Sequence, residues 1–252
     1  MYKILAKLPF ETNTVHYLPS CHSTNEVAQN LLQSDVKEGT IVITDEQIAG
    51  KGQRGNEWLS APGQNLTFSL ILRPRFLMPN EQFFITIAIS LALKEILEEY
   101  LPGQVEIKWP NDIYYKEKKM VGLLIENVLR GSTFESCIVG IGLNVNQTVF
   151  PAGLRATSIR EGTGSALDLN FVFNKLVEGV AAYYFQLKED GRELLRDNYH
   201  QALLGLAEER RFVANNEEFI GVIEGTDAFG RLLIKQGEDI RVFQHKEVEM
   251  LF

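Results

Sequence analysis

The residues best placed to do chemistry lie in one stretch, residues 108–126, which reads KWPNDIYYKEKKMVGLLIE. The proline after Trp109 disfavours helix, and the Asn-Asp pair that follows is typical of a turn. A short strand, a charged tip at residues 116–119 and a returning apolar strand then predict a hairpin. The hairpin would bring Lys108, Asn111, Asp112, Lys119 and Gly122 together. Such a group suits a site that binds anions and positions a nucleophile.

The charged tip also has a simpler interpretation. Lys116, Glu117 and Lys118 are typical of a solvated surface, because charge runs usually face water. Lys119 differs because it directly precedes the apolar residues 120–125. Its side chain must either extend back to the surface or pair with another group. Position alone leaves a site role and a surface role for Lys119 equally open.

A second candidate is the glycine-rich segment 50–55, GKGQRG. It contains GxGxxG, but the segment after it is a loop rather than a helix, which argues against a dinucleotide-binding turn. A P-loop is also excluded, because no Gly-Lys-Ser/Thr follows. Backbone N–H groups freed by glycines, with Lys51 and Arg54 nearby, favour anion binding over a plain surface loop. Trp58 fits a core or a site position equally well.

Two further groups have a structural and a functional interpretation. Ser23, Thr24, Asn25 and Glu26 resemble the start of a helix with a capping box, and taken alone they favour a cap over a ligand site. Residues 140–144, GIGLN, end a strand, where glycines usually permit close backbone packing. The same glycines would let a flat ring lie on the backbone beside Asn144. The sequence alone favours packing.

The sequence lacks the motifs that other kinds of active site require. His16, His22, His200 and His245 are scattered without metal-ligand spacing, so no metal site is predicted from side-chain motifs. No GxSxG nucleophile elbow is present. Cys137 lies in an apolar strand and is predicted to be a core residue.

Apolar periodicity predicts the elements that must position these groups. Helices are expected at residues 80–100, 169–190 and 192–204, and strands at 40–44, 65–72, 105–107, 113–115, 120–128 and 133–143. From about residue 208 the pattern changes to short strands separated by turns. We therefore predict an α+β fold with a mixed or antiparallel sheet and helices in a domain spanning 1–206. A small β-barrel domain spanning 207–252 would follow.

Bulk properties narrow the class of protein. The 252 residues are 45% hydrophobic, enough for a sizeable core, and the net charge of −8 argues against general nucleic-acid binding. No apolar run approaches a membrane span, and the first residues do not form a signal peptide. Two cysteines without CxxC spacing suit a reducing compartment. The expected location is the cytoplasm, with no membrane partner.

Taken together, these motifs resemble the biotin–protein ligase family. The resemblance rests on Ser23 to Asn25, Gln47 with the glycine-rich segment, KWPND at 108–112, Lys119 with Gly122, and Gly140 to Asn144, in matching order and spacing. It implies a catalytic domain related to class II aminoacyl-tRNA synthetases and lipoate ligases. It also implies a C-terminal barrel of the Src-homology-3 type.

The resemblance implies a reaction in two steps. Biotin and ATP, with Mg²⁺, give biotinyl-5′-AMP, and a lysine of a biotin carboxyl carrier protein domain then accepts the biotinyl group. The implied catalytic residues are Lys119, Asp112, Lys108 and Arg54. The implied biotin-binding residues are Ser23, Thr24, Asn25, Gln47, Lys51, Gly52, Gln53, Lys119 and Gly122, where Gly122 leaves room for the ring system. The implied ATP- and adenylate-binding residues are Gly50, Lys51, Gly52, Gln53, Arg54, Gly55, Trp58, Asn111, Lys119 and Asn144.

The chain departs from the family pattern in two ways. The family segment usually reads GRGRRG, so Lys51 lacks the guanidinium fork and Gln53 lacks a charge. We expect a looser hold on the reactive adenylate. The catalytic pattern also begins almost at Met1, which leaves no room for an N-terminal helix-turn-helix and argues against a DNA-binding repressor.

Two other functions remain as alternatives to a biotin ligase. A lipoate or octanoate ligase or transferase of the same superfamily is disfavoured by KWPND. A non-catalytic regulator that binds biotin or a nucleotide is disfavoured because Lys119 is present. An exposed sheet edge could pair with a second subunit, so a homodimer is possible.

Overall fold

The protein is built on a seven-stranded mixed sheet whose strands run in the order β1-β2-β3-β7-β6-β5-β4. The computed structural model describes residues 2–4, 8–52, 55–131 and 133–252. Strands β1 and β2 are parallel, and the other neighbours in the sheet are antiparallel. The predicted α+β class with a mixed sheet is confirmed.

The large sheet and the helices that accompany it are formed by the following elements, in chain order. They are β1 (Val15–Cys21), α1 (Thr24–Leu31), β2 (Ile41–Gln47), β3 (Leu66–Leu72), a 3-10 turn η2 (Pro79–Glu81), α2 (Phe83–Tyr100), β4 (Val105–Lys108), β5 (Asp112–Tyr115), β6 (Lys118–Arg130), β7 (Thr133–Leu143), α3 (Ile159–Thr163), α4 (Leu169–Lys188) and α5 (Arg192–Gln201).

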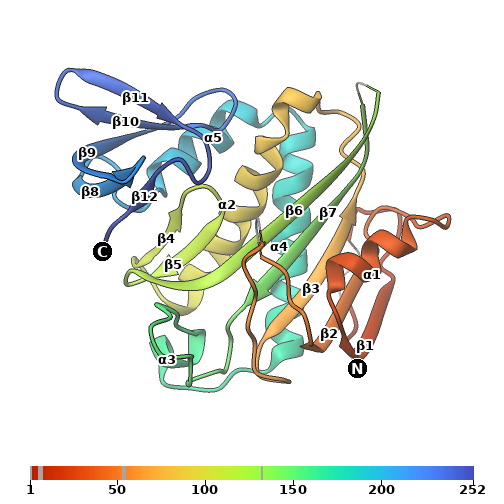
Figure 1. The fold of residues 1–252 in the computed structure, drawn as a ribbon. Helices are drawn as coiled ribbons and strands as arrows, with labels where there is room; N and C mark the ends of the chain where they lie inside the picture. The colour runs from red at the N-terminus through yellow and green to blue at the C-terminus, as the bar shows by residue number, and fades with distance from the viewer. Residues whose placement is uncertain (1, 5–7, 53–54, 132) are drawn as a thin grey trace.

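Helices cover both faces of the sheet (Figure 1). Helices α2 and α4 lie side by side behind it and form the large core with strand residues such as Phe68 and Ile141. Helix α1 packs on the opposite face, where Ala28 contacts Val42, Ile71 and Ile138 in a small second core. Strand residues on both sides of β2, β3 and β7 are therefore buried, as expected for a sheet covered on two faces.

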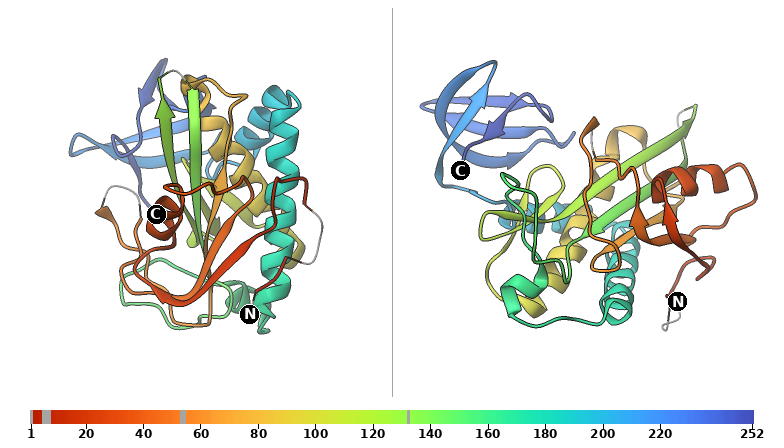
Figure 2. Two further views of the ribbon diagram at one scale, coloured as in Figure 1. Left: turned by 90° about the vertical axis from the view of Figure 1, so that its right-hand side faces the viewer. Right: turned by 60° about the horizontal axis from the view of Figure 1, so that its bottom comes forward.

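A second, five-stranded antiparallel sheet follows α5, with the order β11-β10-β9-β8-β12. Its strands are β8 (Glu209–Ala214), β9 (Glu217–Thr226), β10 (Leu232–Gln236), β11 (Asp239–Phe243) and β12 (Glu249–Met250). This sheet lies beside the β4–β5 end of the large sheet (Figures 1 and 2). The indole Nε1 of Trp109 donates to the carbonyl of Gly230 at 2.9 Å and ties the two sheets together.

The structure differs from the sequence-based prediction at the tip of the β5–β6 hairpin and at β1. The expected four-residue tip at 116–119 is a two-residue turn, because Lys116 and Glu117 both adopt positive φ (49° and 57°) and close the hairpin at once. Lys119 therefore lies inside β6. Strand β1 was missed because Pro19 interrupts it, and an edge strand tolerates the missing N–H. In the described part of the chain, no helix is long and apolar enough to cross a membrane.

A histidine at the junction of α5 and the second sheet predicts how stability depends on pH. The backbone N–H of Thr226 donates to Nε2 of His200 at 3.1 Å, so this nitrogen is unprotonated. Burial, with a smaller contribution from Arg196, lowers the pKa of His200 below 6.5, while Asp197 opposes this. The unfolded chain therefore binds the proton more readily. The stabilisation is fully present above the unfolded pKa and is lost as the pH falls below it.

We expect the melting temperature to fall between pH 7.5 and pH 5.5, and to fall less in His200→Gln, whose amide oxygen can still accept the Thr226 N–H. Thermal unfolding at both pH values measures the difference. The exposed His16 gives a control, since His16→Gln should keep the wild-type pH dependence. An unchanged dependence in His200→Gln would contradict the assignment.

Candidate active site

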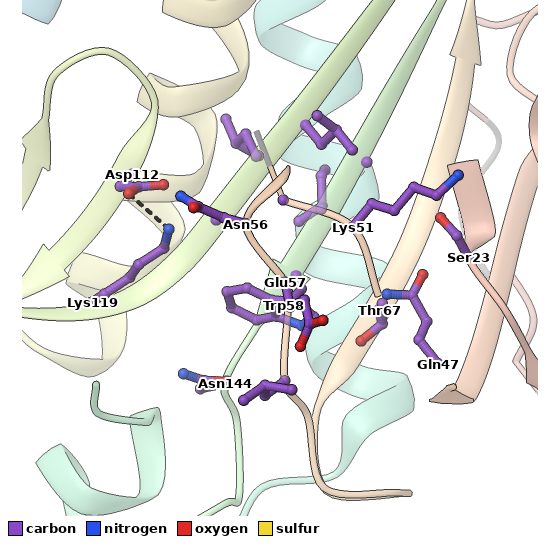
Figure 3. A pocket seen from close by; sticks show the side chains of 18 of the residues that line it. Ser23, Gln47, Lys51, Asn56, Glu57, Trp58, Thr67, Asp112, Lys119 and Asn144 are labelled. Atoms are coloured by element: carbon purple, nitrogen blue, oxygen red, sulfur yellow. Dashed lines mark ion pairs between the residues drawn. The ribbon is translucent and has the colours of Figure 1, made fainter. Parts of the chain in front are cut away.

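A cavity of about 420 Å³ lies on the α1 side of the large sheet and brings together most of the predicted site residues. Figure 3 shows their side chains converging from α1, the segment after β2, and strands β5 to β7. The predicted residues that line the cavity are Ser23, Thr24, Asn25, Gln47, Lys51, Gly52, Trp58, Asn111, Asp112, Lys119, Gly122 and Asn144. Residues far apart in sequence thus form one site.

One end of the cavity is a buried polar network at the start of α1. The amide Oε1 of Gln47 accepts from the Thr24 N–H at 2.8 Å and lies 3.1 Å from the Thr24 hydroxyl. Ser69, from β3, lies 2.7 Å from the Thr24 hydroxyl and 2.6 Å from Oδ1 of Asn25. Ser23 occupies the N-cap position, but its buried hydroxyl makes no capping hydrogen bond. The expected capping box is therefore wrong, and this hydroxyl faces the cavity instead.

The other end carries a charged pair. The Lys119 ammonium lies 2.7 Å from Oδ2 of Asp112, and both side chains keep about a quarter to a third of their surface exposed. Asn111 fixes the turn before Asp112, because its amide donates to the carbonyl of Leu123 at 2.6 Å. The hairpin therefore presents a cation and a carboxylate to the cavity in a fixed relation. A partly solvated ammonium of this kind can bind an anionic ligand without a change in the fold.

The floor of the cavity is made of glycine backbone covered by an indole. Gly122 and Gly142 face each other across β6 and β7. A Cβ on Gly142 would lie 2.3 Å from the Trp58 ring, and one on Gly122 would lie 3.0 Å from it. The space over Gly122 is bordered here by the protein's own indole. Trp58 therefore lines the cavity rather than the core.

Unpartnered polar atoms mark the same region as a binding site. Asn144 is 3% exposed, and its amide N–H donates to the carbonyl of Thr157 at 3.0 Å. Within the described chain, its Oδ1 and the Nε1 of Trp58 are buried without a hydrogen-bond partner. A buried acceptor and a buried donor left unpaired in a cavity cost free energy unless a ligand or water satisfies them. Asn144 and Trp58 can thus hold a flat polar ligand.

The described residues of the glycine-rich segment and those just after it make close backbone contacts, and Lys51 and Gly52 line the cavity. The Gly52 N–H donates to the Asn56 carbonyl at 2.7 Å, and the Trp58 N–H to the Gly50 carbonyl at 2.9 Å. A Cβ on Gly50 would lie 2.4 Å from the Trp58 carbonyl, so this close approach requires glycine. Lys51 pairs with Glu26 at 3.4 Å, with both side chains about half exposed. Gly50 and Gly55 do not line the cavity, and the predicted Gln53 and Arg54 lie outside the described residues.

Lys108 is the expected catalytic residue that the structure places elsewhere. It lines a neighbouring cavity of about 530 Å³, between the hairpin and the second sheet, rather than the cavity of Lys119. Its ammonium lies 5.4 Å from the ring centre of Tyr114 and 5.1 Å from that of Phe252. Burial lowers the pKa of Lys108, and the nearby Asp112 partly opposes this. The packing is that of a cation held between aromatic rings.

Sequence reasoning missed several residues that shape the cavity. Ser69, on β3, contacts Thr24 and Asn25, and Glu126, on β6, accepts a hydrogen bond from Asn25. A serine or a glutamate within a strand belongs to no motif that would reveal these contacts. Further lining residues not predicted from the sequence include Asn56, Glu57, Thr67, Phe150, Leu154 and His245. The described residues contain no cluster of three or more His, Cys, Asp or Glu side chains suited to a metal ion.

Comparisons with known proteins agree with this geometry. The sequence model of the biotin/lipoate A/B protein ligase family matches residues 17–144. The bifunctional ligase/repressor BirA of Bacillus subtilis is 33% identical over 233 residues, covering 90% of this chain and 71% of that protein. The biotin–[acetyl-CoA-carboxylase] ligase of Paracoccus denitrificans is 29% identical over 216 residues, covering 82% of this chain and 88% of that one.

A solved structure of similar shape is that of the biotin protein ligase from Aquifex aeolicus in complex with biotin and ATP. It has a TM-score of 0.80 and 30% sequence identity, and the match covers 95% of this chain and 99% of that one.

The packing of the Trp58 indole on Gly142 and Gly122 predicts effects of different size for two substitutions. Gly142→Ala should displace the Trp58 indole because the new methyl would overlap the ring, whereas Gly122→Ala should shift it less. Trp109 is the second tryptophan, so the experiment uses a Trp109→Phe background and measures Trp58 fluorescence. We expect a red shift as the indole gains water, larger for Gly142→Ala. Equal spectra for all three proteins would contradict the packing of the indole on Gly142.

Proposed function

The chain belongs to the biotin/lipoate A/B protein ligase family, and we propose that the cavity beneath residues 49–58 is its active site. The protein is an ATP-dependent biotin ligase that forms biotinyl-5′-AMP and transfers the biotinyl group to the carrier domain of a biotin-dependent carboxylase. The observation that carries the placement is the cavity itself. It joins a buried polar network at one end to the Lys119–Asp112 pair at the other.

The polar end suits the ureido ring of biotin. Thr24 and Gln47 lie in a buried network, where a polar ring can exchange its water for hydrogen bonds. Ser23 adds a hydroxyl that the helix does not use. Asn25 supports this end from below rather than pointing a free amide into it, because its amide protons go to Leu124 and Glu126.

The charged end suits the reacting groups. The biotin carboxylate attacks the α-phosphorus of ATP, and pyrophosphate leaves as the carboxylate–phosphate bond forms. Lys119 would stabilise the negative charge that gathers on the phosphoryl oxygens in the transition state. Asp112, 2.7 Å away, holds the ammonium in place before substrate arrives. In the second step the acceptor lysine amine attacks the biotinyl carbonyl and AMP leaves.

Trp58 and Asn144 suit the adenine end. The indole offers a flat face for stacking, and Oδ1 of Asn144 is a buried acceptor that can receive an exocyclic N–H. Lys51, Gly52, Gln53 and Arg54 would cover the phosphates. Gly50 and Gly55 would act by letting the glycine-rich segment turn, since neither lines the cavity. Asn111 acts by holding the turn before Asp112.

Magnesium would be held largely by the phosphates of ATP, which is the common arrangement for this ion. Asp112 is a carboxylate of the cavity that could add a protein ligand, and it is partly exposed there. The ion would neutralise phosphate charge. Lys119 and Asp112 perform the positioning described above whether or not Asp112 also binds the ion.

Lys108 would act indirectly. Its ammonium packs on Tyr114 and Phe252 outside the main cavity, so it can support Asp112 through their paired positions on β4 and β5. The second sheet would be a small barrel of the Src-homology-3 type, with the domains divided as 1–206 and 207–252. Short antiparallel strands joined by tight turns support this assignment.

The cellular setting follows from the same features. Cys21 and Cys137 are free thiols, which suits the cytoplasm. A homodimer could form along β1, an edge strand of the large sheet. The other edge, β4, is partly covered, because Ile107 exchanges backbone hydrogen bonds with Ala202 and Leu204.

Exchange of labelled pyrophosphate into ATP without carrier protein tests the first step. We expect biotin-dependent exchange by the wild type and its loss in Lys119→Ala by a factor of order 10²–10³. Biotin binding should weaken only modestly. The matched control is Lys118→Ala, which removes the neighbouring exposed lysine of the same strand and should leave exchange intact.

Equal losses in exchange and biotin affinity would assign Lys119 to ground-state binding instead. Exchange with lipoate but not with biotin would assign the chain to the lipoate branch of the family. No exchange with either compound would favour a binding protein.

The glycine-rich segment makes a separate prediction. Because Gln53 stands where the family pattern has a charged residue, we expect Gln53→Arg to slow release of free biotinyl-5′-AMP when no acceptor is present. The measurement is the rate at which labelled adenylate appears in a filtrate after single-turnover synthesis. An unchanged rate would contradict a role for this position in retention, and Lys118→Ala again serves as the control.

A further inference from the structure

The backbone of Lys119 is held by a segment that lies beyond the end of β7. The pairing of β7 with β6 ends opposite Val121. Beyond that point the Lys119 N–H donates to the Arg155 carbonyl at 2.9 Å, and the Thr157 N–H donates to the Lys119 carbonyl at 2.9 Å. Residues 155–157 therefore add a short parallel pairing to β6, at the residue that carries the ammonium of the charged pair.

The same segment forms part of the cavity wall. Leu154 and Ala156 line the cavity. The guanidinium of Arg155, between them in sequence, packs instead on Phe252, 4.6 Å from the centre of its ring. A displacement of this segment would therefore change both the wall of the cavity and the backbone position of Lys119.

Glu117 holds the segment through a carboxylate that two arginines share. It lies in the turn that leads into β6 and has a φ of 57°. Its Oε2 lies 3.6 Å from Nη2 of Arg155, and its Oε1 lies 2.7 Å from Nη1 of Arg210 on β8. One carboxylate thereby joins the hairpin that carries Lys119, the segment 155–157 and the second sheet.

The arrangement depends on charge. Arg210 is about a quarter exposed and also pairs with Glu208 at 2.8 Å, so its guanidinium is fixed between two carboxylates. A neutral side chain at position 117 would leave the guanidiniums of Arg155 and Arg210 without the carboxylate that they share, and like charges repel. Partly exposed ion pairs add little to the free energy of unfolding. The effect of this carboxylate is therefore expected in the position of residues 155–157 rather than in folding.

We propose that Glu117 is a positioning residue of the reaction, which fixes Lys119 by tying the segment 155–157 to the second sheet. Glu117 does not line the cavity, so it acts through its neighbours and not on a ligand. Its contribution is measurable because a reacting group displaced by about 1 Å can lose about 100-fold in rate. This inference rests on the proposed role of Lys119 in adenylate formation.

The experiment measures biotin-dependent exchange of labelled pyrophosphate into ATP by Glu117→Gln. We expect the maximal rate to fall about tenfold, because Lys119 is less well placed for the transition state. The KM for biotin should stay the same, because the polar end of the cavity is built from other segments. Rates are expressed per biotin-binding site, counted by titration calorimetry, so that a loss of folded protein is not counted as a slower reaction.

Variants of the partner arginine test whether the two side chains act together. Arg210→Gln should also lower the maximal rate, and the double variant with Glu117→Gln should be no slower than Arg210→Gln alone. Arg210→Lys keeps a cation and should retain more of the rate than Arg210→Gln. Losses that add in the double variant would contradict the shared carboxylate.

Glu218→Gln is the matched control, because Glu218 forms an ion pair of the same length, 2.7 Å, with Arg211 on the second sheet and lines neither cavity. It should exchange at the wild-type rate. A wild-type rate per site in Glu117→Gln, or an equal loss in Glu218→Gln, would overturn the positioning role and leave the proposed function intact. No exchange by the wild type would overturn the proposed function and this inference with it.

Discussion

The cavity depends on the pairing of two strands where they lack side chains. In the β6–β7 hairpin, Gly122 faces Gly142 and Leu124 faces Gly140, so one stretch of the sheet is nearly bare backbone. Asn25 uses the space over Gly140, and Trp58 uses the space over Gly142. A methyl group at either position would push these side chains away from the sheet. Glycine here costs conformational entropy and provides close approach of other groups.

The turn between β4 and β5 separates two tasks within one short motif. Asn111 and Asp112 turn toward the cavity, where the amide is fixed by the Leu123 carbonyl and the carboxylate meets Lys119. Lys108 and Trp109 turn toward the second sheet, through Phe252 and the Gly230 carbonyl. Adjacent residues therefore join the reacting end of the cavity to the packing of the second sheet. The turn that carries Asp112 is thus in contact with that sheet through the residues that precede it.

The sequence predicted the elements whose signals are local, and it failed where tertiary contacts decide. The long helix α2, the long strands of the β6–β7 hairpin and the pattern of short strands after residue 208 follow from periodicity and turn residues. Strand β1 carries a proline and needed its partner β2 to be recognised. Ser23 is a residue type that commonly caps helices, but its side chain makes no capping hydrogen bond. Lys108 belongs to the most specific motif, yet its burial beside Tyr114 and Phe252 is not visible in the sequence.

Two of the residues that sequence reasoning could not find, Ser69 and Glu126, share the property that they contact other side chains of the site. Ser69 and Glu126 carry no motif because a strand accepts many residues at their positions, and their effect is only to fix which way Asn25 and Thr24 point. A hydroxyl can donate once, so its role is decided by the neighbour that cannot donate at all. In this cavity that neighbour is Oδ1 of Asn25, and its orientation is set by the Leu124 carbonyl and the Glu126 carboxylate. The orientation of the Asn25 amide is therefore determined by groups on the strand beneath it.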